Sequence, residues 1–146
     1  NRHLGVAFHD HRPKPALAAL RTMNLIFGRG FERLGDAVTV ERPEASESVV
    51  RAFLTSEQRA VVIAWLENRK RTAPRPENEA GLEVDTRTER VRVTLPFRAV
   101  GEAVAFDAVG ERVPPPLALD SAHGVTLALD LYGGDVAIVE VPVARP

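Results

Sequence analysis

Two stretches of alternating apolar and polar residues constrain the fold of this chain more than any other feature. The first places an apolar residue at every second position from Val91 to Phe97, and the second does so from Val125 to Leu131. A period of two belongs to a β-strand that buries one face and exposes the other to solvent. Both stretches therefore predict half-buried antiparallel strands.

Turn-forming residues divide the chain from about residue 36 onward into short segments, and no helical pattern interrupts them. Such a succession predicts an antiparallel β-sandwich, in a chain that is mainly β. The three prolines at 114–116 must lie at an edge or a crossover, because proline has no N–H to donate to a ladder. About eight strands are predicted, at 36–41, 48–54, 59–67, 88–96, 102–107, 111–119 (interrupted), 124–131 and 135–142.

One N-terminal α-helix is predicted before these strands. Pro13 and Pro15 suit a first helical turn, where a missing N–H leaves nothing unpaired, and Gly28 supplies a stop after Phe27. One face of the helix would carry Ala16, Ala19, Leu20, Met23 and Phe27, while Leu17 and Leu25 flank Arg21 on the other side.

A helix that is apolar nearly all round requires burial on more than one face, and a small sandwich can cover only one of them. The pattern therefore indicates a partner that lies outside the sandwich. We expect Leu17, Leu20, Leu25 and Phe27 to form the docking surface for that partner.

Composition excludes several classes of partner. The formal net charge of -1 argues against a general nucleic-acid binder, which carries a basic excess. No apolar stretch approaches the ~20 residues of a membrane helix. The chain has no cysteine, which excludes thiolate metal sites, and no Gly-rich phosphate loop, so no cofactor is expected. The sequence indicates no particular cellular compartment.

No metal site and no catalytic residue is predicted. His9, Asp10 and His11 are of metal-binding types, but neighbours in sequence point in different directions, and Asp10 is better explained as a helix cap or as the partner of Arg12. Asp120, Ser121 and His123 are too close in sequence to form a relay, so a polar turn is expected there. The basic run at 69–71 is flanked by glutamates and is interpreted as a solvated loop.

One residue is a candidate for contact with a sugar. Tyr132 lies on the polar phase of its predicted strand, beside the Gly133–Gly134 turn, so its ring is expected to be exposed. Aromatic rings complement the apolar faces of pyranoses. The other aromatic residues, Trp65 among them, are assigned to the core by default.

Residues 4–20 resemble a junction found in glycosidases with a (β/α)8 barrel of the large retaining clan A. In that family a Gly-containing final strand is followed by Asp, by Arg-Pro-Lys-Pro-Ala and by an alanine- and leucine-rich last helix. His11 departs from the pattern, where a glycine is more usual. The residues that match are Gly5, Asp10, Arg12, Pro13, Lys14, Pro15 and Ala16, and the later segments around Phe106–Asp107, Gly124–Leu127 and Val136–Ile138 are similar to the C-terminal sandwich of such enzymes.

The resemblance implies that residues 1–34 are the terminal segment of a (β/α)8 barrel and residues 35–146 a C-terminal β-sandwich domain. It further implies a parent glycosidase whose two catalytic carboxylates lie upstream of Asn1, so this chain alone would be inactive. Its expected partner is the catalytic barrel, in the same parent chain or as a separate polypeptide. The alternative is a free-standing β-sandwich that binds a carbohydrate or a protein.

Overall fold

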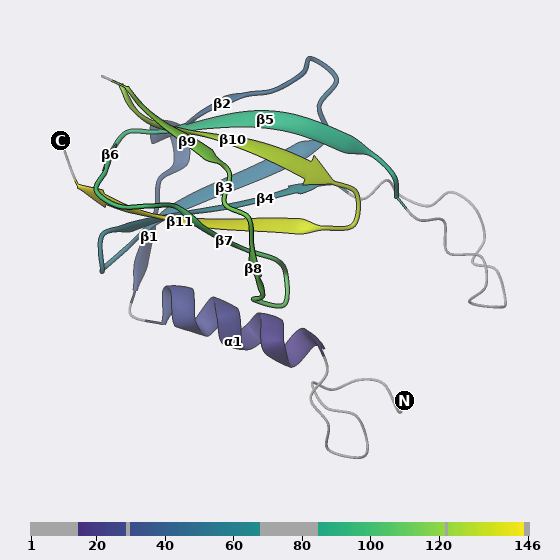
Figure 1. The fold of residues 1–146 in the computed structure, drawn as a ribbon, viewed down its shortest axis with the longest axis horizontal. Coiled ribbons are helices and arrows are strands. Elements are labelled where there is room, and N and C mark those ends of the chain that lie inside the picture. The colour runs from purple at the N-terminus through teal and green to yellow at the C-terminus, as the bar shows by residue number, and fades with distance from the viewer. Residues whose placement is uncertain (1–14, 29, 68–84, 122, 145–146) are drawn as a thin grey trace, which may run out of the picture.

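Two antiparallel sheets face one another, and a single helix lies on the outer side of the larger sheet (Figure 1). The computed structural model describes residues 15–28, 30–67, 85–121 and 123–144. The chain is mainly β with one helix before the strands, as the alternation predicted.

The helix α1 spans Pro15–Phe27, close to the predicted bounds, and a short 3-10 helix η1 spans Gly35–Ala37. The seven-stranded sheet has the order β1 (Phe31–Arg33), β3 (Ser48–Thr55), β4 (Arg59–Leu66), β11 (Val136–Ala144), β7 (Val104–Phe106) and β8 (Arg112–Val113), with β6 (Arg98–Ala99) pairing with β11. The four-stranded sheet has the order β2 (Thr39–Glu41), β5 (Thr88–Leu95), β10 (Gly124–Tyr132) and β9 (Leu117–Ser121).

The five longest strands lie within two residues of their predicted bounds, and the short ones differ more. The segment predicted as one strand at 36–41 is divided into η1 and β2, and Gly35 begins η1 with a φ of 52°. The strand predicted at 102–107 is shortened to β7. The prolines at 114–116 separate β8 from β9, which explains the interruption predicted at 111–119.

Strand β1 was not predicted. It pairs with β3 and thereby joins the seven-stranded sheet, so sheet pairing starts before the predicted domain boundary at residue 35. Its three residues are all exposed and are too few to show a period of two.

The core lies between the two sheets and contains the apolar phase of both alternating stretches. Strands β5 and β10 pair in register, with Val93 opposite Leu127, and each of these two side chains is 0% exposed. The facing residues come from β3, β4, β7 and β11, and include Leu54, Val62, Leu66, Ala105, Val139 and Val141. The polar phase of β5 and β10 points outward, as a half-buried strand requires.

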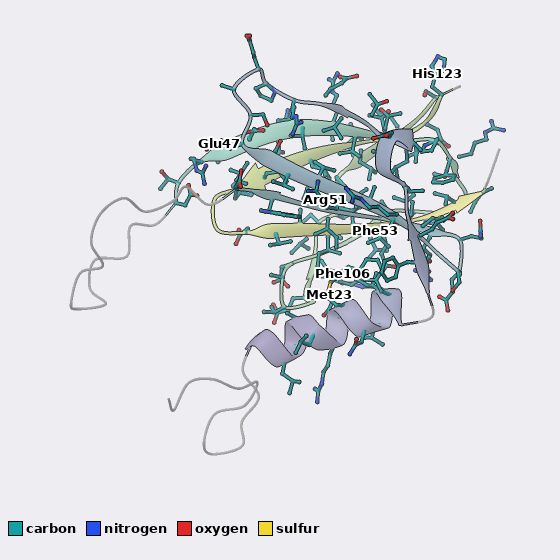
Figure 2. All side chains as sticks on the ribbon, turned by 180° about the vertical axis from the view of Figure 1, so that it is seen from behind. Met23, Glu47, Arg51, Phe53, Phe106 and His123 are labelled. Atoms are coloured by element: carbon teal, nitrogen blue, oxygen red, sulfur yellow. The ribbon has the colours of Figure 1, made fainter. Side chains whose placement is uncertain are left out.

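Helix α1 covers the outer face of the seven-stranded sheet. The ring of Phe27 lies 5.2 Å from the ring of Phe53 on β3 and 4.8 Å from that of Phe31 on β1. Met23 extends from the helix to the side of the sheet where Phe53 and Phe106 lie (Figure 2). A Cβ added to Gly110, in the turn between β7 and β8, would stand 2.0 Å from the hydroxyl of Thr22, so the helix also lies close to this turn.

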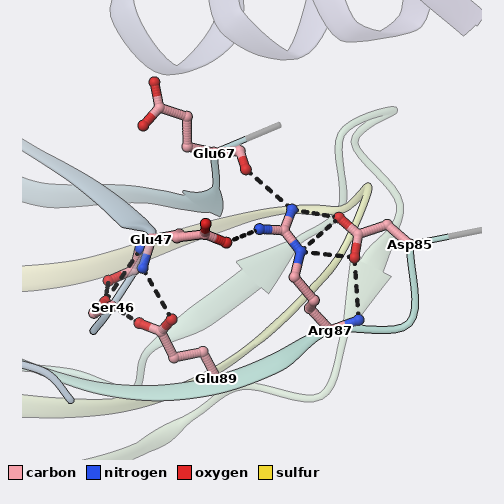
Figure 3. A network of polar contacts seen from close by, with 7 residues as sticks. Ser46, Glu47, Glu67, Asp85, Arg87 and Glu89 are labelled. Atoms are coloured by element: carbon pink, nitrogen blue, oxygen red, sulfur yellow. Dashed lines mark hydrogen bonds and ion pairs between the residues drawn. The ribbon is translucent and has the colours of Figure 1, made fainter. Parts of the chain in front are cut away.

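A polar network joins the end of β4 to the beginning of β5 (Figure 3). The guanidinium of Arg87 donates to Asp85 (Nε to Oδ1, 2.8 Å), to the carbonyl of Glu67 (3.0 Å) and to the carboxylate of Glu47. The hydrogen bond with Asp85 is the main cause that raises the pKa of Arg87 above its ordinary value. Arg87 therefore fixes the two points between which residues 68–84 run.

We expect Leu127→Ala to destabilise the fold by about 3 kcal/mol, because a fully buried leucine loses its contacts and leaves a cavity. Urea unfolding followed by circular dichroism measures the change. Leu119→Ala on β9 is the matched control: Leu119 is 56% exposed, so its loss should alter the free energy of unfolding by less than about 0.5 kcal/mol. Equal effects of the two variants would contradict the assignment of Leu127 to the core.

Candidate functional site

The surface of α1 that is not packed on the sheet carries both exposed leucines and exposed polar residues. Leu25 is 87% exposed and Leu20 is 51% exposed, while Leu17 is partly buried. Arg21 and Asn24 are the exposed polar residues on this side of the helix. These leucines do not share one side of the helix, because Leu20 lies on the same side as Phe27 and Leu25 lies about 140° around the helix axis from Leu20. We call the exposed surface that carries Leu17, Leu20 and Leu25 the outer face of α1.

Phe27 does not belong to this outer face. Its ring packs edge-on against Phe31 and Phe53, so it holds the helix on the seven-stranded sheet. The predicted docking residues are therefore divided between two roles: Phe27 contributes to contacts within the chain, while Leu20 and Leu25 are exposed on different sides of the helix.

A second feature is a cleft at one edge of the sandwich, with a volume of about 760 Å³. Pairing between β9 and β10 ends at Leu117 opposite Ala128, because the prolines at 114–116 cannot extend the ladder. Strand β10 continues to Tyr132 beyond the end of that pairing, and the cleft opens there between the two sheets.

We call this feature the edge cleft. One wall is the crossover from Pro114 to Leu117, and its floor includes Ala105 and Val139 of the core. Its volume lies within the range of about 300–1,000 Å³ that is typical of small-ligand sites. Its other lining residues include Arg90, Asp107, Asp130, Tyr132 and Asp135.

Charged groups lie in the cleft lining beside an exposed aromatic ring. Arg90 donates two hydrogen bonds to Asp130, from Nε to Oδ1 (2.6 Å) and from Nη2 to Oδ2 (3.0 Å). Oδ1 of Asp107 accepts the backbone N–H groups of Val109 and Glu111, at 3.0 Å and 2.8 Å. Tyr132, the residue predicted to contact a sugar, is 53% exposed.

The ion pair between Arg90 and Asp130 favours the charged form of both side chains. The hydrogen bond from Arg90 lowers the pKa of Asp130 below its usual range, and the same bond raises the pKa of Arg90. Both side chains are at least half exposed, at 72% and 50%, so the pair contributes little to stability.

The remaining candidates give no further site. His9, Asp10, His11 and the basic run at 69–71 lie outside the described residues. Within the described ranges, no group of histidines and carboxylates could hold a metal ion, and no helix is long and apolar enough to cross a membrane. The hydroxyl of Ser121 donates to the carbonyl of Gly124 within the turn between β9 and β10, and the carboxylate of Asp120 accepts the N–H of Ala99 on β6.

The sequence singled out Tyr132 but not the cleft that it lines. The one signal for the cleft was the run of three prolines at 114–116, since a strand that cannot pair must leave its neighbour partly uncovered. Arg90 and Asp130 are far apart in the sequence, and only the register of β5 with β10 places them opposite each other.

Comparison with protein-family models and with curated proteins found no match for this chain.

We expect Arg90→Gln to raise the pKa of Asp130 towards the ordinary value of about 4. A carboxyl whose pKa is lowered by folding stabilises the fold above its unfolded pKa, and that contribution is lost as the pH falls through the lower, folded pKa. Replacing Arg90 should therefore remove a small stabilisation that is fully present at neutral pH. A ¹³C NMR titration of the Asp130 carboxyl measures the shift. Arg51→Gln, on the other sheet, should leave that titration unchanged.

Proposed function

We propose that this chain is the non-catalytic β-sandwich portion of a retaining glycoside hydrolase, and that it packs on the catalytic (β/α)8 barrel and stabilises it. The observation that carries the proposal is that Phe27 holds α1 on the seven-stranded sheet while Leu20 and Leu25 remain exposed to solvent.

The exposed leucines of α1 provide a driving force for docking. Burying a leucine side chain fully contributes about 1.5–3 kcal/mol, and Leu25 has nearly all of that contribution still to gain. Interfaces between domains of one protein bury roughly 600–1,500 Å², which is more than three leucines supply. The docking surface would therefore extend beyond the outer face of α1.

The junction resemblance identifies the class of partner. In the parent enzyme two carboxylates about 5–5.5 Å apart would act as the acid/base and the nucleophile. Such groups lie at the strand ends of a barrel, where its active sites are built. No residue of this chain is assigned to that chemistry. The role of the sandwich would be to cover the last barrel helix and to hold it in place.

One observation favours the alternative of a free-standing binding module. The edge cleft holds an exposed tyrosine next to charged groups, which a purely structural sandwich does not require. A free-standing module would bind a glycan or a protein without any barrel. It would also leave Leu20 and Leu25 exposed in its functional state.

We expect Leu25→Ser to weaken association with the barrel by about 2 kcal/mol, or roughly 30-fold, because a buried leucine would be lost from the interface. Native mass spectrometry of the chain mixed with the barrel polypeptide measures this loss where the two are separate. Where they form one polypeptide, limited proteolysis of the parent measures the exposure of the junction between them.

Leu119→Ser is the matched control, because it removes an exposed leucine from β9, on the opposite sheet, and should leave association unchanged. Two results would overturn the proposal. One is a wild-type chain that is monodisperse in its source with no larger species; the other is glycoside hydrolysis by the chain alone.

A further inference from the structure

We infer that the edge cleft is a binding site for a neutral saccharide, a short run of pyranose units held outside any catalytic centre. This inference goes beyond the proposed docking role and does not depend on it. No residue of α1 lines the cleft, so the two surfaces share no side chain.

The lining of the cleft has the two kinds of surface that a pyranose requires. Tyr132 offers an exposed ring at the end of β10, and the crossover from Pro114 to Leu117 forms an apolar wall. Leu117 is itself 64% exposed. The C–H faces of a sugar ring pack on such surfaces, while its hydroxyl groups point towards polar side chains.

The polar groups of the lining match hydroxyl groups in kind. Arg90 provides N–H donors and the carboxylates of Asp107, Asp130 and Asp135 provide acceptors, in addition to the hydrogen bonds that Arg90 donates to Asp130 and that Asp107 accepts from the backbone. A carboxylate or guanidinium forms stronger hydrogen bonds than a neutral group, and the Arg90–Asp130 pair holds its two members in a defined geometry.

The charge of this lining selects among glycans. Three carboxylates against one guanidinium give an acidic surface, which repels uronates, sulfated sugars and phosphates. A neutral polyhydroxyl chain meets no such repulsion. We therefore expect the edge cleft to bind neutral glycans.

An extended peptide is a different occupant, and the structure favours it less. A peptide strand would pair with the part of β10 beyond Ala128, but the facing wall is proline, which has no N–H to donate. A peptide could therefore be hydrogen-bonded through its backbone on one side only. Backbone pairing would also make no use of the Tyr132 ring.

Calorimetric titration of the 146-residue chain with neutral cello-, xylo- and manno-oligosaccharides tests the inference, with oligogalacturonate as the anionic comparison. We expect binding of at least one neutral series, and binding of oligogalacturonate about ten-fold weaker or undetectable. Tyr132→Ala should weaken the neutral binding by about ten-fold or more through the loss of stacking, while Tyr132→Phe should keep it within about three-fold. Asp130→Asn should also weaken it, because a charged acceptor becomes a neutral one.

Leu25→Ser is the matched control, since it alters the outer face of α1 and should leave glycan affinity unchanged. Circular dichroism of each variant establishes that a lost affinity is not a lost fold. The inference is overturned if no neutral glycan binds, if Tyr132→Ala binds as well as the wild type, or if oligogalacturonate binds best. The inference is also overturned, in favour of a peptide site, if no glycan binds and an extended peptide binds in a way that Tyr132→Ala abolishes. None of these outcomes bears on docking to a barrel, which is measured separately.

Discussion

The arrangement of this chain depends on an apolar outer face of the seven-stranded sheet that must be kept from water. Val61 and Ile138 lie on that face, yet they are 0% and 4% exposed, and α1 lies over it (Figure 1). Phe27 anchors the helix to Phe53, and this contact fixes which side of the helix is left outward. A helix apolar on one side only would complete the fold. This helix has leucines on its second side as well, so the packing that finishes the sandwich also presents a second apolar surface.

The outer face of the four-stranded sheet is polar and exposed to solvent. Its outer face carries Arg90, Arg92 and Thr94 on β5, and strand alternation keeps the apolar side inward, so this sheet needs no covering layer. The two sheets therefore differ in their outer faces: the larger one is packed against a helix, and the smaller one carries charged side chains at the surface. The edge cleft lies where the crossover at 114–116 passes between them, and its lining combines core apolar residues with those charges.

Local patterns predicted the longest strands and the helix because their periods arise within single segments. The inward residues of β5 and β10 followed from alternation alone, and the strand break followed from proline chemistry. The outward placement of Phe53 and Phe106 could not be predicted, because it depends on the helix that covers them. The Arg87 network and the Arg90–Asp130 pair could not be predicted either, because each joins residues that only the pairing of the strands brings together. Tyr132 was found by its phase in the strand, but the cleft around it requires two sheets.

The two surfaces differ in the physics that would govern them. Contact through Leu20 and Leu25 would be driven by removal of apolar area from water, which added salt does not screen. Binding in the edge cleft would depend on charged hydrogen-bonding groups, among them Asp130, whose pKa is lowered by its hydrogen bond from Arg90. A glycosidase carrying this sandwich could thus hold a neutral saccharide at the sheet edge while α1 is buried against the barrel. The sandwich would then serve both as a brace for the barrel and as a second point of attachment to the polysaccharide.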